Sequence, residues 1–114
     1  MELTKSEKRI ARELVSKSVD EECRQFMEKV EALVGRRRDD QAPKERFWEL
    51  HDMFREFAKH LTQKYDSIPG AYDLKIMRLY MEKRISKEDV ERFAPETQEW
   101  IFNIEKSARE YKEG

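Results

Sequence analysis

The fold class follows most directly from residues 43–65, which read PKERFWELHDMFREFAKHLTQKY. Large apolar side chains recur here every three or four residues, which is the spacing of an α-helix, and they fall within a stripe about 100° wide on a helical wheel. Pro43 suits the first turn of such a helix. The stripe predicts a helix that packs this side into the core. Its members are Phe47, Leu50, Phe54, Phe57, Ala58, Leu61 and Tyr65.

A long helix is predicted before this stretch, over residues 4–34. Thr4 and Glu7 have the spacing of a capping box, and Gly35 stands where a helix commonly ends. The apolar positions are helically spaced, but their stripe drifts around the helix in the first half and holds steady in the second. One long helix with a bend near residues 16–18 is the preferred prediction, and two separate helices are the alternative.

The chain after residue 65 shows a turn at residues 67–70 and then a helical pattern over residues 72–84. This pattern is apolar on two sides, and such a helix either packs centrally in a bundle or uses one side to bind a partner. The first side carries Tyr72, Ile76, Leu79 and Tyr80. The second side carries Leu74, Met77, Met81 and Ile85.

Two further helices complete the prediction. Ser86 begins a capping pattern for a short helix that ends near Phe93, and the last helix runs over residues 95–112. One side of the last helix carries Trp100, Ile101, Ile104, Ala108 and Tyr111, whereas Phe102 lies outside this stripe. Apolar and polar residues do not alternate over strand length anywhere in the chain. We therefore expect an all-α fold, a compact bundle of four or five helices with short connections in a single domain over residues 1–114.

Composition supports a folded chain that carries its charges outside. Charged residues make up 43% of the 114 residues, but the net charge is only −1 and aromatic residues reach 11%. Disordered chains are usually poor in aromatic residues. The balanced charge gives no general attraction to nucleic acid or anionic lipid. Because Cys23 is the only cysteine and no apolar run approaches the length of a signal peptide or a membrane span, we expect a cytoplasmic protein.

Residues with catalytic chemistry are few. His51 and His60 are nine positions apart, so they point to opposite sides of one helix and cannot share a metal ion within it. Cys23 falls within an apolar stripe, which favours an inert buried thiol. The chain also has too few internal glycines for a phosphate-binding loop. We therefore predict no catalytic residue, metal or cofactor, and no enzyme activity.

The cluster Arg36, Arg37 and Arg38 is the one basic feature that stands apart. It follows a predicted helix end, where cations interact well with the helix dipole, and it is also a possible contact for an anion or nucleic acid. Asp39 and Asp40 follow at once and weaken the second interpretation. A DNA-reading unit over residues 72–93 is disfavoured, because its second helix would present acidic residues to the phosphates.

The sequence thus favours a non-enzymatic helical module that binds a protein or assembles with itself, most simply as a symmetric dimer. The predicted contact face is the second side of the helix at residues 72–84, formed by Leu74, Met77, Met81 and Ile85. The charged residues between 88 and 105 are mainly acidic, so they could pair with the arginine cluster within one copy or between two. The alternatives are a nucleic-acid-binding accessory protein that uses Arg36–Arg38 and, less favoured, a small enzyme with an unrecognised site.

Overall fold

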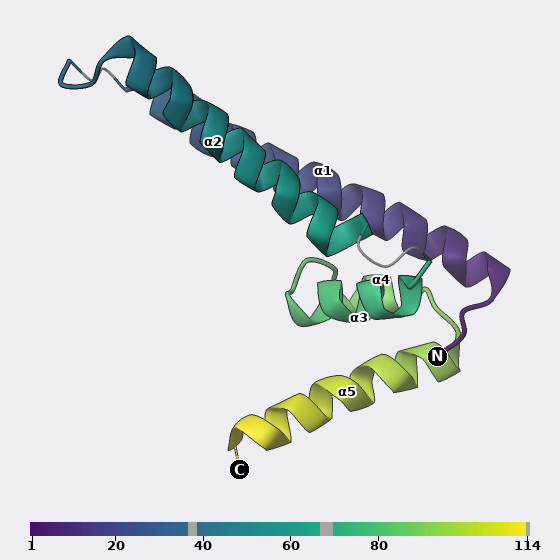
Figure 1. The fold of residues 1–114 in the computed structure, drawn as a ribbon. Coiled ribbons are helices and arrows are strands. Elements are labelled where there is room, and N and C mark those ends of the chain that lie inside the picture. Colours follow the sequence, from purple (N-terminus) through teal and green to yellow (C-terminus); the bar gives the residue numbers. More distant parts are fainter. Residues whose placement is uncertain (37–38, 67–69, 114) are drawn as a thin grey trace. The chain divides into compact units, whose positions relative to one another are not determined.

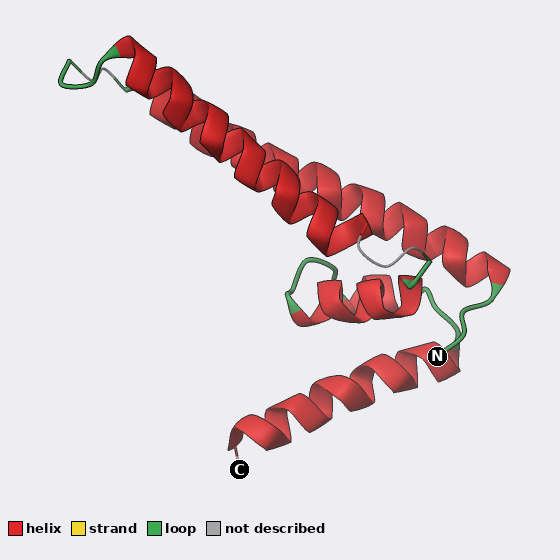
Figure 2. Cartoon of the chain, in the orientation of Figure 1, coloured by secondary structure: helices red, strands yellow, loops and turns green. Residues whose placement is uncertain are grey.

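A computed structural model describes residues 1–36, 39–66 and 70–113 (Figure 1). These residues form five α-helices and a short π-helix and contain no strand (Figure 2). The elements are α1 (Lys5–Gly35), α2 (Pro43–Leu61), the π-helix η1 (Thr62–Asp66), α3 (Tyr72–Met81), α4 (Lys87–Val90) and α5 (Pro95–Glu113). The helices pack against one another, so the predicted all-α fold of four or five helices is confirmed.

The chain divides into two compact units, and α1 contributes to both. The first unit comprises Met1–Ser18 and Gly70–Gly114, and the second comprises Val19–Pro69. α1 is continuous from Lys5 to Gly35, as preferred from the sequence. The division falls next to residues 16–18, where the apolar stripe changes direction. The two halves of α1 pack in different units, which explains why one stripe does not run along the whole helix.

The first unit has a conventional apolar core. It is built from the first half of α1 together with α3, α4 and α5. The predicted inner side of α3 is confirmed at Ile76 and Leu79, which are each 1% exposed. The buried apolar residues of this unit are Leu3, Ala11, Leu14, Ile76, Leu79, Ile85, Val90, Phe93 and Ile101.

Two aromatic predictions on α5 need correction. Tyr111 is 89% exposed, because it lies in the last turns of the helix, beyond the buried position Ile101. Phe102 is half-buried and packs edge-on against Tyr80 of α3, with 5.9 Å between the ring centroids. The apolar stripe of α5 is therefore wider than predicted at Phe102 and shorter at its C-terminal end.

Glu7 joins the start of α1 to the start of α5. The predicted capping box is present, since the Glu7 backbone N–H donates to Thr4 Oγ1 and Thr4 N–H donates to Glu7 Oε1. The other carboxylate oxygen of Glu7 accepts hydrogen bonds from Ala94 N–H at 3.2 Å and from the Thr97 hydroxyl at 2.6 Å. Burial raises the pKa of Glu7, but these hydrogen bonds outweigh burial and lower it overall. One carboxylate thus satisfies backbone donors at two helix starts.

The second predicted capping box is also present, at α4. Asp89 N–H donates to Ser86 Oγ at 3.1 Å, and Ser86 N–H donates to Asp89 Oδ2 at 2.9 Å. The helix is shorter than predicted and ends at Val90, with Phe93 buried in the turn that follows. Four of the five helices therefore begin where Ser, Thr or Pro residues predicted a start.

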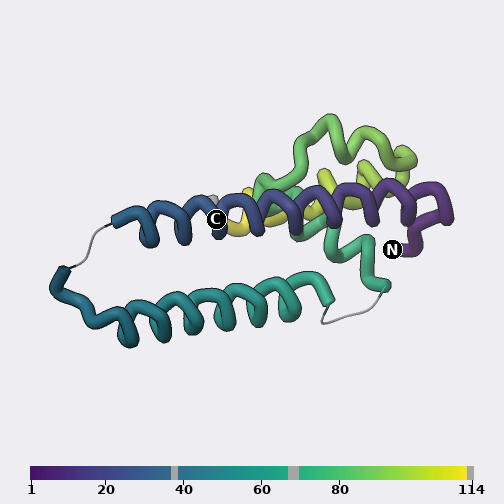
Figure 3. The backbone as a smooth tube through the Cα atoms, turned by 90° about the horizontal axis from the view of Figure 1, so that it is seen from above, coloured from purple at the N-terminus to yellow at the C-terminus, as the bar shows by residue number. Residues whose placement is uncertain are grey.

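The second unit is an antiparallel helical hairpin. The second half of α1 and all of α2 run side by side in opposite directions (Figure 3). α2 ends in the π-helix η1, which carries Tyr65, the one buried member of the predicted α2 stripe. Of the predicted turn at residues 67–70, only Gly70 lies within the described residues. Its φ of 80° is a conformation that glycine adopts without strain.

The prediction that the α2 stripe forms a core is wrong at three of its seven members, and three more are only half-buried. α2 contains no buried residue. Phe47 is 61% exposed, Phe54 is 44% exposed, and Ala58 is also exposed. Within its unit α2 has one helical neighbour, and a single helix covers only a narrow strip of another. A stripe about 100° wide is too broad to be covered in this way.

Candidate functional site

An exposed aromatic surface on α2 is the most unusual feature of the second unit. Phe47, Trp48 and Phe54 are 61%, 50% and 44% exposed. Large apolar side chains are usually among the better buried ones, and contiguous exposed apolar patches commonly mark binding sites. The surface is therefore the leading candidate for a functional site.

The aromatic rings on this surface hold one another in place. Phe26 of α1 stacks on Phe57 with 4.1 Å between centroids and meets Phe54 edge-on at 5.2 Å. Phe47 meets Trp48 edge-on at 5.2 Å. Such contacts add to the energy of burial and restrict the rings to defined orientations. These contacts therefore define how the rings on this surface are oriented relative to one another.

α1 contributes two exposed apolar residues, Met27 and Val34. They are seven positions apart, as are Phe47 and Phe54 on α2, so each pair lies on one side of its helix. Phe54 contacts Phe26, and Met27 and Val34 lie on the flank of α1 that adjoins this contact. The two pairs therefore belong to the same side of the hairpin. We call Met27, Val34, Phe47 and Phe54 the hairpin face.

The opposite side of the hairpin carries a buried polar cluster around Glu22. The Glu22 side chain is 6% exposed, and its carboxylate receives Tyr65 Oη, His60 Nε2 at 3.0 Å and Lys64 Nζ at 3.2 Å. Burial raises the pKa of Glu22, but the hydrogen bonds from Tyr65, His60 and Lys64, together with the Lys64 charge, outweigh it. The pKa falls to about 2.

This cluster is suited to holding the hairpin together. A carboxylate with a pKa of about 2 is a poor proton acceptor near neutral pH, whereas a general base works best with a pKa near the working pH. Glu22 instead ties α1 to α2 and η1 by charged hydrogen bonds, which are stronger than neutral ones. No sequence pattern indicates this role of Glu22, since one Glu among many is distinguished only when the helices pair.

Arg46 of α2 joins the two helices at the other end of the hairpin. Its Nη2 donates to the carbonyl oxygens of Leu33, Val34 and Arg36 at 3.2, 2.5 and 3.2 Å. These carbonyls belong to the last turn of α1 and the residue after it, where backbone acceptors lack partners within the helix. The hairpin face thus lies between two sets of polar contacts that join α1 to α2, one around Glu22 and one around Arg46.

The arginine cluster predicted to contact an anion is described only at Arg36, which is exposed and whose carbonyl accepts from Arg46. Arg37 and Arg38 lie outside the described residues. Besides Arg36, the structure places the Arg46 guanidinium of α2 at the end of α1.

The predicted contact face on α3 is only partly at the surface. Leu74 and Met81 are exposed and Met77 is half-buried, but Ile85 is 6% exposed and belongs to the core. The surface that remains is smaller than the one on the hairpin and contains no aromatic ring.

The histidines and the cysteine have ordinary surroundings. His51 meets Trp48 edge-on and lies beside Asp52, while His60 binds Glu22 and stacks on Phe57. His60 therefore faces α1. Cys23 is half-buried. Within residues 1–36, 39–66 and 70–113, no three His, Cys, Asp or Glu side chains gather as metal ligands would.

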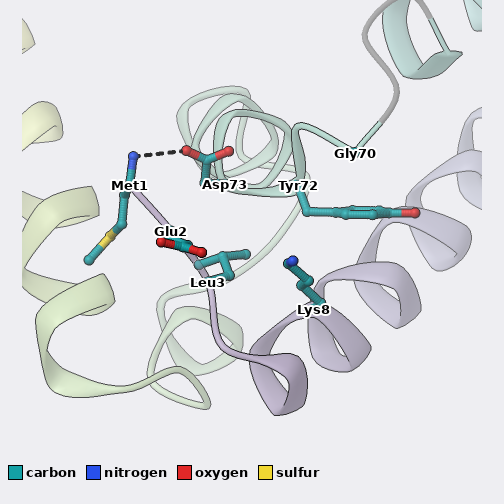
Figure 4. A pocket seen from close by; sticks show the side chains of 7 residues that line it. All are labelled: Met1, Glu2, Leu3, Lys8, Gly70, Tyr72 and Asp73. Atoms are coloured by element: carbon teal, nitrogen blue, oxygen red, sulfur yellow. Dashed lines mark hydrogen bonds and ion pairs between the residues drawn. The ribbon is translucent and has the colours of Figure 1, made fainter.

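A small open pocket of about 160 Å³ lies in the first unit (Figure 4). It is lined by Met1, Glu2, Leu3, Lys8, Gly70, Tyr72 and Asp73. On the wall of this pocket, the amino group of Met1 forms an ion pair with the Asp73 carboxylate at 3.1 Å. Its volume is below the roughly 300–1,000 Å³ of typical small-molecule sites.

In the part of the chain that the structure describes, no helix is both long enough and apolar enough to cross a membrane. Comparison with protein-family models, with curated proteins and with solved structures found no match for this chain.

Proposed function

We propose that this protein is a non-enzymatic protein-binding module that recognises its partner through the hairpin face. The observation that carries the proposal is that α2 buries none of its residues while exposing Phe47 and Phe54 of the hairpin face and Trp48 beside Phe47. Apolar surface left in water costs about 25 cal/mol per Å², so a partner that covers these rings gains binding energy.

The rigidity of the hairpin supports this proposal. The Glu22 cluster and Arg46 hold α1 against α2 at its two ends, and the Phe26 stack fixes the rings between them. Binding to an ordered surface avoids much of the entropy cost of arranging side chains. Aromatic residues are also the type most often found at the energetic centre of protein interfaces. We place this activity in the cytoplasm, which suits a chain with a single cysteine.

Site-specific photocrosslinking in the native cell tests the proposal. A photoreactive phenylalanine analogue at His51, which is exposed beside Trp48, should give a protein adduct of defined mass. The same analogue at Tyr111, 89% exposed on α5, is the matched control and should not give that adduct. The adduct should disappear when Phe47 and Phe54 are replaced by Ser. Equal adducts from both positions, or none from position 51, would contradict the proposal.

A further inference from the structure

We infer that the partner of the hairpin face is the hairpin of a second copy of this chain, so that two hairpins form a four-helix bundle. This inference rests on the proposed function and names the partner of the same surface.

The hairpin is a single layer of two helices with one apolar side. Its other side is occupied by the Glu22 cluster, whose carboxylate is 6% exposed and already bound by Tyr65, His60 and Lys64. A layer with one apolar side is stable when a second layer covers that side. A second hairpin of equal length matches it residue for residue, and the result is an ordinary four-helix bundle.

The exposed area suits the centre of such an interface. A fully exposed aromatic residue offers about 150–250 Å², so the exposed parts of Phe47, Phe54, Met27 and Val34 amount to roughly 400 Å² per copy. Stable interfaces bury about 800 Å² on each partner. The hairpin face thus supplies about half, and the polar rims of α1 and α2 must supply the rest.

The two outer edges of the hairpin, which we call its rims, carry opposite charges. One rim lies on the side of α1 away from α2, and the other on the side of α2 away from α1. At about 100° per residue, Asp20 and Glu31 lie just beyond Met27 on α1, on the side away from α2. Both are exposed, and neither forms an ion pair among the described residues. Arg24, further round the helix, is held by Glu21 and Glu28. The outer rim of α1 is therefore acidic.

The outer rim of α2 is basic. Lys44, Arg55 and Lys59 lie beyond Phe47, on the side away from α1, and all three are exposed. Arg55 is 3.5 Å from Asp52, whereas Lys44 and Lys59 form no ion pair among the described residues. Each hairpin thus has one acidic and one basic edge.

This distribution of charge on the two rims favours one of two possible two-fold symmetric arrangements of the dimer. A two-fold axis parallel to the helices places α1 of each copy against α2 of the other, so the acidic rim meets the basic rim twice. Glu22 lies level with His60 in the hairpin, so Asp20 of one copy comes within about one helical turn of Lys59 of its partner along the helix axis. A two-fold axis perpendicular to the helices would instead set acid against acid and base against base.

The first test is the oligomeric state of the intact chain, measured by light scattering and sedimentation at high micromolar concentration. We expect a dimer whose dissociation constant rises roughly 100-fold in the double variant Phe47→Ser, Phe54→Ser, with its helix content retained. The control variant Leu74→Ser, Met81→Ser changes the exposed apolar residues of α3 and should leave the dimer intact. A wild-type monomer, or loss of the dimer only in the control, would overturn the inference.

The second test uses the charges. The variant Asp20→Lys, Glu31→Lys has two basic rims, and the variant Lys44→Glu, Arg55→Glu, Lys59→Glu has two acidic ones. Each alone should dimerise roughly tenfold more weakly at low salt, and the two mixed should form a heterodimer. If each variant alone dimerises as well as the wild type, the inferred arrangement is wrong.

The two proposals can fail separately. A wild-type monomer that still gives the adduct from position 51, dependent on Phe47 and Phe54, leaves a binding module with a different protein partner and rejects the second copy. A monomer with no such adduct rejects both proposals.

Discussion

Glu22 shows how a single side chain can secure a helix pair. Its carboxylate is buried, yet it is kept ionised by Tyr65, His60 and Lys64, which approach from one end of α2 and the following η1. A buried carboxylate without partners would be costly and would take up a proton instead. Burial of this charge is therefore tolerated only because α2 and η1 supply its hydrogen-bond donors.

The Glu22 cluster predicts a pH-dependent stability. The pKa of Glu22 is about 2 in the folded chain against an ordinary value of 4.5, so its stabilisation is fully present above pH 4.5 and is lost as the pH falls towards 2. Glu22→Gln should lower the free energy of unfolding at pH 7 by about 2 kcal/mol, and the difference should shrink below pH 4.5. Urea titrations followed by Trp48 fluorescence in a Trp100→Phe background measure this in the second unit.

Glu28→Gln is the matched control for this prediction, because Glu28 lies on the same helix but forms an exposed ion pair with Arg24. Exposed pairs contribute less than about 1 kcal/mol. A Glu22→Gln effect that persists unchanged at pH 2 would show that lost packing, rather than charge, causes it.

Glu7 has the corresponding role in the first unit. Glu7→Ala removes the acceptor of Thr4 N–H, Ala94 N–H and the Thr97 hydroxyl, and leaves these donors in a buried place. We expect a loss of about 2 kcal/mol in the free energy of unfolding, read from Trp100 fluorescence in a Trp48→Phe background. Glu13→Ala is the control, since Glu13 only pairs with Arg92 at the surface, and it should change stability little. Equal effects of the two variants would refute the capping role.

At the scale of elements, α3 shows that a helix with two apolar sides can bury one of them and leave the other exposed. Its inner side is buried at Ile76 and Leu79, while its outer side is exposed at Leu74 and Met81. The sequence pattern records residue type and spacing but not neighbours, so it shows two apolar sides without showing how deeply each is buried. Only the packing of α1, α4 and α5 distinguishes them.

Paired substitutions on α3 check this assignment. Leu79→Ala should cost about 3 kcal/mol in the free energy of unfolding, since it leaves a cavity at a position that is 1% exposed. Leu74→Ala removes the same atoms from an exposed position and should cost less than about 1 kcal/mol. Thermal or urea melts followed by circular dichroism compare them. A larger loss at Leu74 than at Leu79 would mean that the two sides are wrongly assigned.

α1 is an element that changes its partners along its length. Its first half packs in the first unit through Ala11 and Leu14, and its second half pairs with α2 through Phe26 and the Glu22 carboxylate. The drift of its apolar stripe near residues 16–18 signalled this change, although the sequence did not identify the partners. The interpretation of α2 failed for a related reason, since an apolar stripe shows which side avoids water but not whether this chain covers it.

At the scale of the whole molecule, the inferred dimer makes thermal stability depend on concentration. Association stabilises the folded hairpin by mass action, so the melting temperature of the second unit should rise as the protein concentration rises. In the Phe47→Ser, Phe54→Ser variant this dependence should vanish. Melts at several concentrations, followed by Trp48 fluorescence in a Trp100→Phe background, test the prediction. A melting temperature independent of concentration in the parent protein would count against a dimer held by this surface.

The sequence by itself determined the secondary structure of this protein and most of its helix boundaries. Pro43, Pro95, the Thr4–Glu7 box and the Ser86–Asp89 box act through neighbouring backbone groups, so their effects can be read without knowing the fold. The fold class and the continuity of α1 followed from the same local signals.

Only the tertiary structure decided which apolar sides are covered and which charges meet. The exposure of Phe47 and Phe54 and the four-residue cluster around Glu22 depend on residues far apart in the chain, and no local pattern encodes their meeting. For this reason the candidate binding site lies on the hairpin, whereas the sequence pattern had placed it on α3. A binding surface is an apolar side that the chain leaves uncovered, and that property exists only once every other element has taken its place.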